Sequence, residues 1–125
     1  MKKFSIDKIL QLHGKMIEAT GGDSGIRDIG LLHSAISNAY ATFDGVDLYK
    51  TIEEKCASVC FSIINNHPFL DGNKRMGIFV MLVFLEYNNI PLKYTQNELI
   101  DLGLGIAQGK YKQTYILEWL NGHKD

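Results

Sequence analysis

The amino-acid sequence predicts an all-α fold, a bundle of about six helices with at most one short β-hairpin near residues 43–50. Apolar residues recur every three or four positions through most of the chain, which is the spacing of one buried helix face. Alternation of apolar and polar residues, which is typical of a half-buried strand, is nowhere sustained beyond four residues. Two Thr-x-x-Glu capping boxes, Thr51–Glu54 and Thr95–Glu98, indicate where two of the helices begin.

The first half of the chain is expected to hold three helices. The first begins after Ser5, a good N-cap residue, and ends at the glycine-rich loop 21–25. A second is predicted from about Asp28 to Phe43. A third runs from Thr51 to the residues before Pro68, because the residue preceding a proline disfavours helical angles. The expected inward faces are Ile6, Ile9, Leu10, His13, Met16 and Ile17 in the first helix, and Leu31, Leu32, Ala35, Ile36 and Ala39 in the second.

The second half is expected to hold three more helices. The fourth starts near Gly72–Asn73 and runs to about Asn88, and Pro91 lies beyond its end. The fifth runs from Thr95 to about Ala107, and the last covers roughly Gln113 to Leu120. The fourth helix contains the longest apolar run of the chain, Met76 to Leu85, which we expect to be buried on all sides.

Composition sets the class of protein. The chain has 125 residues, of which 46% are hydrophobic and 22% charged, a normal balance for a globular protein. This excludes a disordered chain, a collagen-like chain and a disulfide scaffold, and it predicts a single domain over residues 1–125. The net charge of −1 argues against a dedicated nucleic-acid binder, which normally carries a basic excess.

The two cysteines favour a cytoplasmic protein. Cys56 and Cys60 lie four residues apart in an apolar stretch, so we expect buried thiols in a reducing compartment. The alternative is half of a metal site with His67, but no second ligand pair follows at suitable spacing. The N-terminal residues lack the apolar stretch of a signal peptide, and the apolar run of the fourth helix is shorter than the ~20 residues that span a bilayer. We therefore expect no membrane partner.

Candidate chemistry is concentrated in one segment, His67–Arg75, of sequence HPFLDGNKR. The predicted start of a helix at Gly72–Asn73 offers free backbone N–H groups and a positive dipole end, which together favour an anion. Lys74 and Arg75 would lie on the first turn of that helix, where cations are unfavourable unless an anion offsets them. The segment thus indicates a phosphate site.

The same segment holds two further candidates. Asp71 could bind a divalent cation that bridges phosphates, and His67 could act as a general base. Each residue also has an ordinary structural explanation: a helix-ending histidine, an N-cap aspartate, and a solvated face for the two cations. Phe69 is expected to anchor the loop in the core under either interpretation. The co-occurrence of base, carboxylate and anion cradle favours phosphate chemistry.

These residues resemble the signature of the Fic/Doc family, H-x-F-x-[DE]-G-N-G-R-x-x-R in its Fic branch. The resemblance to the Doc (death-on-curing) branch covers nearly the whole chain, from about Ile6 to Leu120. The segments that carry it outside the motif are Gly21–Asp28, Gly30–Leu32, Leu48–Tyr49 and Glu53–Lys55. The resemblance implies a Fic/Doc-like helical bundle and a toxin of a type II toxin–antitoxin system.

The motif departs from the Fic branch at two positions. Lys74 stands where Fic proteins have their second glycine, and Ile78 stands where they have their second arginine. Doc-type members carry lysine at the first position and are understood to transfer the γ-phosphate of ATP rather than AMP. Gly72 departs in the other direction, because the Doc prototype has alanine there. The resemblance therefore implies a protein kinase, with adenylyl transfer and a degenerate, non-catalytic binding module as the alternatives.

The resemblance also implies a role for each motif position. His67 would deprotonate the attacking hydroxyl of a protein target, and Asp71 would bind Mg²⁺. The residues that bind the phosphates of ATP would be Gly72, Asn73, Lys74 and Arg75. ATP as substrate and Mg²⁺ are the expected ligands.

Two further segments match the family pattern. Residues 44–50 correspond to its flap, which can dock a target by strand addition, so the expected docking residues are Val46, Asp47, Leu48 and Tyr49. Arg27 and Asp28 lie in the other family-like loop, where we favour structural pairing or capping over contact with the target.

The expected partners also come from the resemblance. The target would be a translation factor such as elongation factor Tu, modified by a protein that is monomeric when free. Family members are restrained by a [ST]-x-x-x-E-[GN] helix, and the nearest match here, Thr114–Trp119, ends in tryptophan and has the pattern of a core helix. We therefore expect inhibition in trans by a separate antitoxin.

Overall fold

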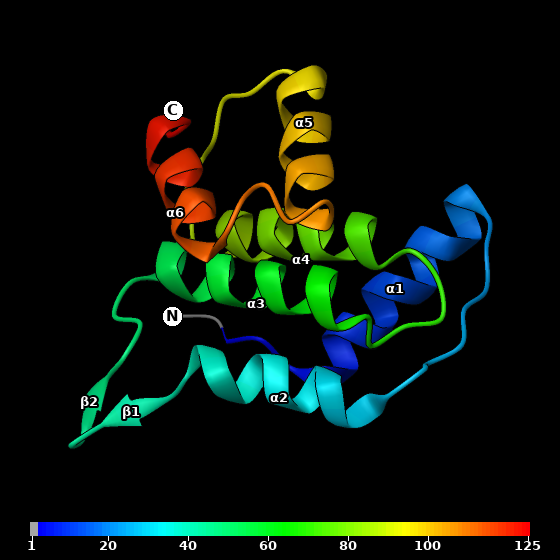
Figure 1. Ribbon diagram of the computed structural model, residues 1–125, viewed down its shortest axis with the longest axis horizontal. Coiled ribbons are helices and arrows are strands. Elements are labelled where there is room, and N and C mark those ends of the chain that lie inside the picture. The colour runs from blue at the N-terminus through cyan, green and yellow to red at the C-terminus, as the bar shows by residue number, and fades with distance from the viewer. Residues whose placement is uncertain (1–2) are drawn as a thin grey trace.

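The computed structural model describes residues 3–125, which form six α-helices and one two-stranded hairpin (Figure 1). The elements in chain order are α1 (Ile6–Thr20), α2 (Ile29–Ala39), β1 (Thr42–Phe43), β2 (Val46–Asp47), α3 (Ile52–Asn66), α4 (Asn73–Tyr87), α5 (Gln96–Ala107) and α6 (Gln113–Gly122). The predicted all-α fold with one short hairpin is confirmed.

The helices α3 and α4 form the centre of the bundle. They run antiparallel, side by side, and the other helices pack around them: α2 and α6 on α3, α1 on α4, and α5 on both (Figure 1). Most of the apolar run in α4 is buried, as its composition predicted. Within residues 3–125, no helix is long and apolar enough to cross a membrane.

The two central helices approach each other closely at Gly77. A Cβ at this position would lie 2.6 Å from Cγ1 of Ile64 and 3.0 Å from the carbonyl oxygen of Cys60. Both cysteines of α3 are free, fully buried thiols, as expected. Burial raises the pKa of the Cys56 thiol to about 12, and it raises the pKa of Cys60 as well, so both stay protonated and serve as core atoms.

Side-chain caps set most of the helix starts. Ser5 accepts a hydrogen bond from the N–H of Lys8, and Asp28 accepts one from the N–H of Leu31. Both predicted capping boxes form, with Glu54 and Glu98 bonding back to the N–H groups of Thr51 and Thr95.

The predicted end of the second helix was wrong. The helix ends at Ala39 rather than near Phe43, because Thr42 pairs with Asp47 and Phe43 with Val46 in an antiparallel hairpin. The turn residues Asp44 and Gly45 have φ values of 52° and 77°. An Asp-Gly pair with two positive φ angles is the preferred two-residue hairpin turn.

The C-terminus is held by a charged histidine. In His123, Nε2 lies 2.7 Å from Oε2 of Glu98 and Nδ1 lies 2.7 Å from the carbonyl oxygen of Trp119, while the ring stacks on the indole. Both partners can only accept, so both ring nitrogens must carry a proton. The bond to Glu98 raises the pKa of His123 and lowers the pKa of the carboxylate.

Two glycine-to-alanine substitutions are expected to change stability in opposite directions. Gly77→Ala should lower the free energy of unfolding by about 1–3 kcal/mol, because its methyl group overlaps α3. Gly14→Ala, in exposed helix with nothing within 4 Å, should raise it by up to about 1 kcal/mol. Urea unfolding of both variants measures this, and equal effects would contradict the close approach of α3 and α4.

His123→Asn should remove a pH-dependent part of the stability. Because the folded pKa of His123 is raised, its contribution is fully present below about pH 6.5 and is lost as the pH rises through the folded pKa. The difference in Tm between wild type and variant should therefore shrink from pH 6 to pH 9. Glu98→Gln, which keeps the capping geometry, should show the same trend, and parallel Tm profiles would show that folding does not raise the pKa of His123.

Candidate active site

The motif segment forms the loop between α3 and α4 and the first turn of α4. His67 is the C-cap of α3 and has left-handed backbone angles, φ 52° and ψ 60°. Gly72 is the N-cap of α4, with φ 78°. The loop opens into a pocket of about 360 Å³. The structure brings the proposed site residues together around this pocket, namely His67, Asp71, Gly72, Asn73, Lys74 and Arg75, with Leu70, Ile64 and Ala107.

A buried aromatic pair holds the loop to α1. Phe69 is 1% exposed and its ring stacks on that of His13, with centroids 3.8 Å apart and planes within 8°. Nε2 of His13 donates to the carbonyl oxygen of Asp71 over 3.0 Å. His13 was not among the candidate site residues, although it is the polar side chain at a predicted inward position of the first helix. A polar side chain at an inward helix position was the sequence signal that could have identified His13.

The loop is closed on itself by Asn73. Its Oδ1 accepts from the N–H of Phe69 over 3.0 Å, and its Nδ2 donates to the carbonyl oxygen of Phe69 over 2.9 Å. The amide side chain therefore satisfies both main-chain groups of the buried Phe69. Of the two N–H groups predicted to be free at this helix start, that of Asn73 remains available for an anion, whereas that of Gly72 donates to Oδ1 of Asp71.

Asp71 is oriented by two backbone N–H groups. Oδ1 accepts from Gly72 over 2.8 Å and Oδ2 accepts from Asp23 over 3.3 Å. Gly22 has φ 118° and lies so close that a Cβ there would overlap the carboxylate. The loop between α1 and α2 thus requires glycine at this point, and it fixes a carboxylate at the edge of the pocket.

The first turn of α4 carries two cations and no acidic residue. Lys74 and Arg75 are exposed, and Nη1 of Arg75 donates to Oγ1 of Thr20 over 2.7 Å. Gly72 provides no side-chain cap for the helix. A positive dipole end with two cations is a strongly anion-attracting arrangement. One turn further on, Ile78 is buried at the position where the Fic motif has its second arginine.

The loop that precedes α2 pairs with the motif. Ile26 and Phe69 form an isolated antiparallel bridge, and the N–H groups of Arg27 and Asp28 both donate to the carbonyl oxygen of Pro68, over 2.8 and 3.0 Å. The Arg27 side chain also donates to the end of α3, and Asp28 caps α2. The structural interpretation of these two residues is confirmed.

The hairpin lies at the other end of α3 from the motif (Figure 1). The helix has 15 residues and is therefore about 22 Å long. The predicted docking residues Val46, Asp47, Leu48 and Tyr49 do not line the 360 Å³ pocket. A target protein that contacted both the hairpin and the pocket would have to lie along α3.

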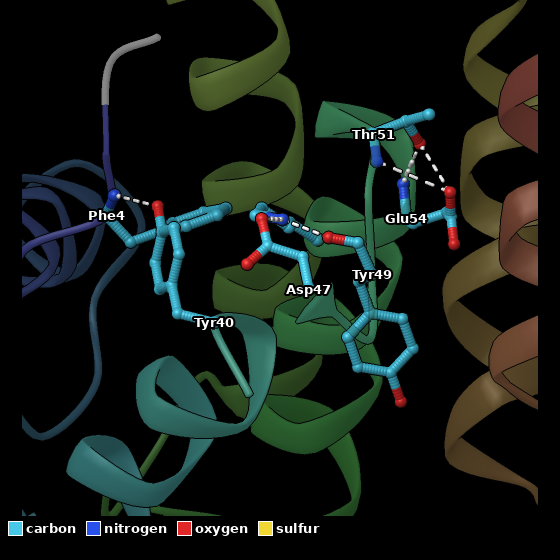
Figure 2. A network of polar contacts seen from close by, with 7 residues as sticks. Phe4, Tyr40, Asp47, Tyr49, Thr51 and Glu54 are labelled. Atoms are coloured by element: carbon cyan, nitrogen blue, oxygen red, sulfur yellow. Dashed lines mark hydrogen bonds and ion pairs between the residues drawn. The ribbon is translucent and has the colours of Figure 1, made fainter. Parts of the chain in front are cut away.

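A buried lysine ties the hairpin to α3. Lys55 is 2% exposed and forms an ion pair with Asp47 over 3.5 Å, and its ammonium also donates to the carbonyl oxygen of Tyr49. Figure 2 shows Asp47 and Tyr49 converging on this point beside Tyr40, whose hydroxyl accepts from the N–H of Phe4. The ammonium lies 5.6 Å from the centre of the Tyr40 ring.

The segment nearest to an inhibitory helix is part of the core. In α6, Ile116 and Leu120 are fully buried and Trp119 is 7% exposed, whereas Glu118 is exposed. The helix packs against α3. The predicted core role of Thr114–Trp119 is confirmed.

Comparisons with known proteins agree with this architecture. Residues 3–85 match the model of the Fic/DOC family, a range that takes in the motif and all but the end of α4. "Toxin Doc" of Mycolicibacterium smegmatis is 39% identical over 74 residues, which are 59% of this chain and 57% of that protein, so the match spans little more than half of it. "Protein kinase doc" of Escherichia phage P1 is 27% identical over 120 residues, 96% of this chain and 94% of that protein. This chain belongs to the Fic/Doc family.

Proposed function

We propose that this protein is a Doc-type toxin that transfers the γ-phosphate of ATP to a hydroxyl group of a protein. The observation that carries the proposal is the pocket of about 360 Å³, where His67 and Asp71 face the cationic first turn of α4. The name of one relative supports the role of a toxin, and the name of the other supports kinase activity.

The residues of the pocket fit ATP and Mg²⁺. Mg²⁺ is usually held by one or two carboxylates together with substrate phosphates, and Asp71 offers a carboxylate that two N–H groups already orient. Bound there, the ion would neutralise phosphate charge. The phosphates are also met by the uncapped start of α4 and by Lys74 and Arg75.

In the transfer step, His67 accepts the proton of the attacking hydroxyl. A bond forms between that oxygen and the γ-phosphorus, and the bond from the γ-phosphorus to the β,γ-bridging oxygen breaks, so that ADP leaves. Lys74 and Arg75 neutralise the charge that develops on the phosphates. Positioning and electrostatic stabilisation supply most of the rate in such reactions.

Two residues favour γ-phosphate transfer over AMP transfer. Lys74 fills the position of the second Fic glycine with a fixed charge, and its stem lies against α5 close to Gly103. Ile78 replaces the guanidinium that AMP transfer uses, and it is buried between α4 and α5. A purely non-catalytic binding module would have no use for a general base such as His67 in the lining of this pocket.

An antitoxin and a protein target are the proposed partners. Because α6 is a core helix, restraint by a separate antitoxin is the mode of control that the fold supports. We place the target among translation factors, of which elongation factor Tu is the leading candidate, and the toxin in the cytoplasm, acting as a monomeric single domain over residues 1–125.

Labelled ATP tests the direction of transfer. In a translation extract, [γ-³²P]ATP should label a protein and [α-³²P]ATP should not. His67→Ala should reduce this labelling by about 10²–10⁴-fold, because the general base is lost. His33→Ala, at an exposed position of α2 that does not line the pocket, is the matched control and should retain activity. Label that arrives only from the α-phosphate would overturn the kinase proposal in favour of adenylyl transfer.

Removal of the metal should stop the reaction. EDTA should abolish labelling, and Asp71→Asn should increase the Mg²⁺ concentration needed for half-maximal labelling at least tenfold, because the carboxylate charge is lost. Asp7→Asn, on the exposed first turn of α1, should leave the requirement unchanged. An unaltered Mg²⁺ requirement in Asp71→Asn would show that this carboxylate does not hold the ion.

A further inference from the structure

We propose that Arg27 is a positioning residue for the transfer reaction, because it fixes the backbone of His67 and so aims the imidazole into the pocket. The geometric part of this inference stands on the structure, and its consequence for the rate rests on the proposed kinase function. Arg27 contributes no atom to the phosphate pocket itself.

The imidazole of His67 needs such support. A general base is normally oriented by a third group that hydrogen-bonds to it. Within residues 3–125, however, His67 is exposed, and its ring makes no hydrogen bond or ion pair with another described residue. The direction of its side chain therefore depends on the backbone angles of the residue.

Those backbone angles are uncommon. Three non-glycine residues of the described chain have positive φ, namely Asp44, His67 and Asn89. Such a conformation is strained for a residue with a Cβ, and it persists where the surroundings over-determine it. For His67 the surroundings are the hydrogen bond from its own N–H to the carbonyl oxygen of Ile63 and the contact that Arg27 makes with its carbonyl oxygen.

Arg27 binds the end of α3 with a two-pronged contact. Its Nε donates to the carbonyl oxygen of His67 over 2.5 Å, and its Nη2 donates to that of Asn66 over 2.5 Å. These carbonyl groups are among the last of the helix, which have no partners within it. The last turn of α3 has no basic residue of its own, so the guanidinium also supplies the cation that this dipole end favours.

The backbone of Arg27 is itself held in place. The N–H of Arg27 donates to the carbonyl oxygen of Pro68, and the N–H of Leu70 donates to that of Gly25, on either side of the Ile26–Phe69 bridge. The main chain of Arg27 thus binds Pro68, and its side chain binds the preceding residue, His67. A lysine here would keep the charge but would lose the planar pair of donors.

The decisive experiment compares Arg27 with its neighbour. Arg27→Gln removes the fork, Arg27→Lys retains the charge, and Asp28→Ala removes the cap of α2 from the same loop without touching His67. The histidine-ring ¹H–¹³C NMR signals of all three proteins are recorded, with the His67 signal assigned by its loss in His67→Ala. Arg27→Gln should shift or broaden that signal, and Asp28→Ala should leave it in place.

Kinetics supply the second measurement. With [γ-³²P]ATP and a translation extract, Arg27→Gln should reduce the maximal labelling rate at least tenfold while the apparent KM for ATP stays within twofold. Arg27→Lys should recover part of the rate. Asp28→Ala should change neither value at a temperature where all proteins are folded by circular dichroism.

The outcomes separate the two proposals. If wild type transfers no phosphate, the proposed function fails, whereas the NMR comparison still decides the geometric role of Arg27. A His67 signal that is unchanged in both Arg27 variants overturns the inference. So does an equal loss of rate in Arg27→Gln and Asp28→Ala, which would mean that the loop acts only through stability. If Arg27→Gln does not fold, Arg27→Lys alone is compared with Asp28→Ala by the same criteria.

Discussion

The loop between α3 and α4 brings the unpaired carbonyl groups of one helix end next to the unpaired amide groups of another. Backbone groups of this kind need partners when they leave a helix. Only one of the two sets receives side-chain partners. Arg27 binds the carbonyl groups that end α3, whereas the start of α4 has no side-chain cap. This asymmetry makes the loop rigid on one side and receptive to an anion on the other.

The rigid side is built from residues distant in sequence. His13 binds the carbonyl oxygen of Asp71, the N–H of Asp23 binds the carboxylate of Asp71, and Arg27 binds the carbonyl oxygen of His67. All three residues precede the motif by some forty to sixty residues. Their elements are held in place by the buried α3–α4 pair, whose close approach depends on Gly77. The site therefore rests on the packing of the whole N-terminal half rather than on the nine motif residues alone.

Local sequence signals were sufficient for the fold class and for most helix boundaries. Caps such as Ser5 and the boxes at Thr51 and Thr95 act through neighbours three residues away, so a single sequence reveals them. The end of α2 was misjudged because Ala39 and Phe43 continue the helical spacing, while the Asp-Gly turn at residue 44 prevails by favouring a hairpin.

Contacts between distant segments could not be predicted in the same way. The stacking of His13 on Phe69 and the fork of Arg27 depend on how α1 and the following loop cross the motif, which no local pattern encodes. The position of the hairpin is similar: its sequence matches a flap, but only the direction of α3 places it a helix length from His67 (Figure 1).

Charge provides the remaining argument for a phosphate ligand. Cations near the start of a helix oppose its dipole and need compensation. In the first turns of α3, Lys55 receives it from Asp47 and the carbonyl of Tyr49 (Figure 2). In α4, no ion pair within residues 3–125 involves Lys74 or Arg75. The net charge of −1 thus conceals one helix start whose lysine is paired with a carboxylate within the chain and another whose two cations have no acidic partner among the described residues.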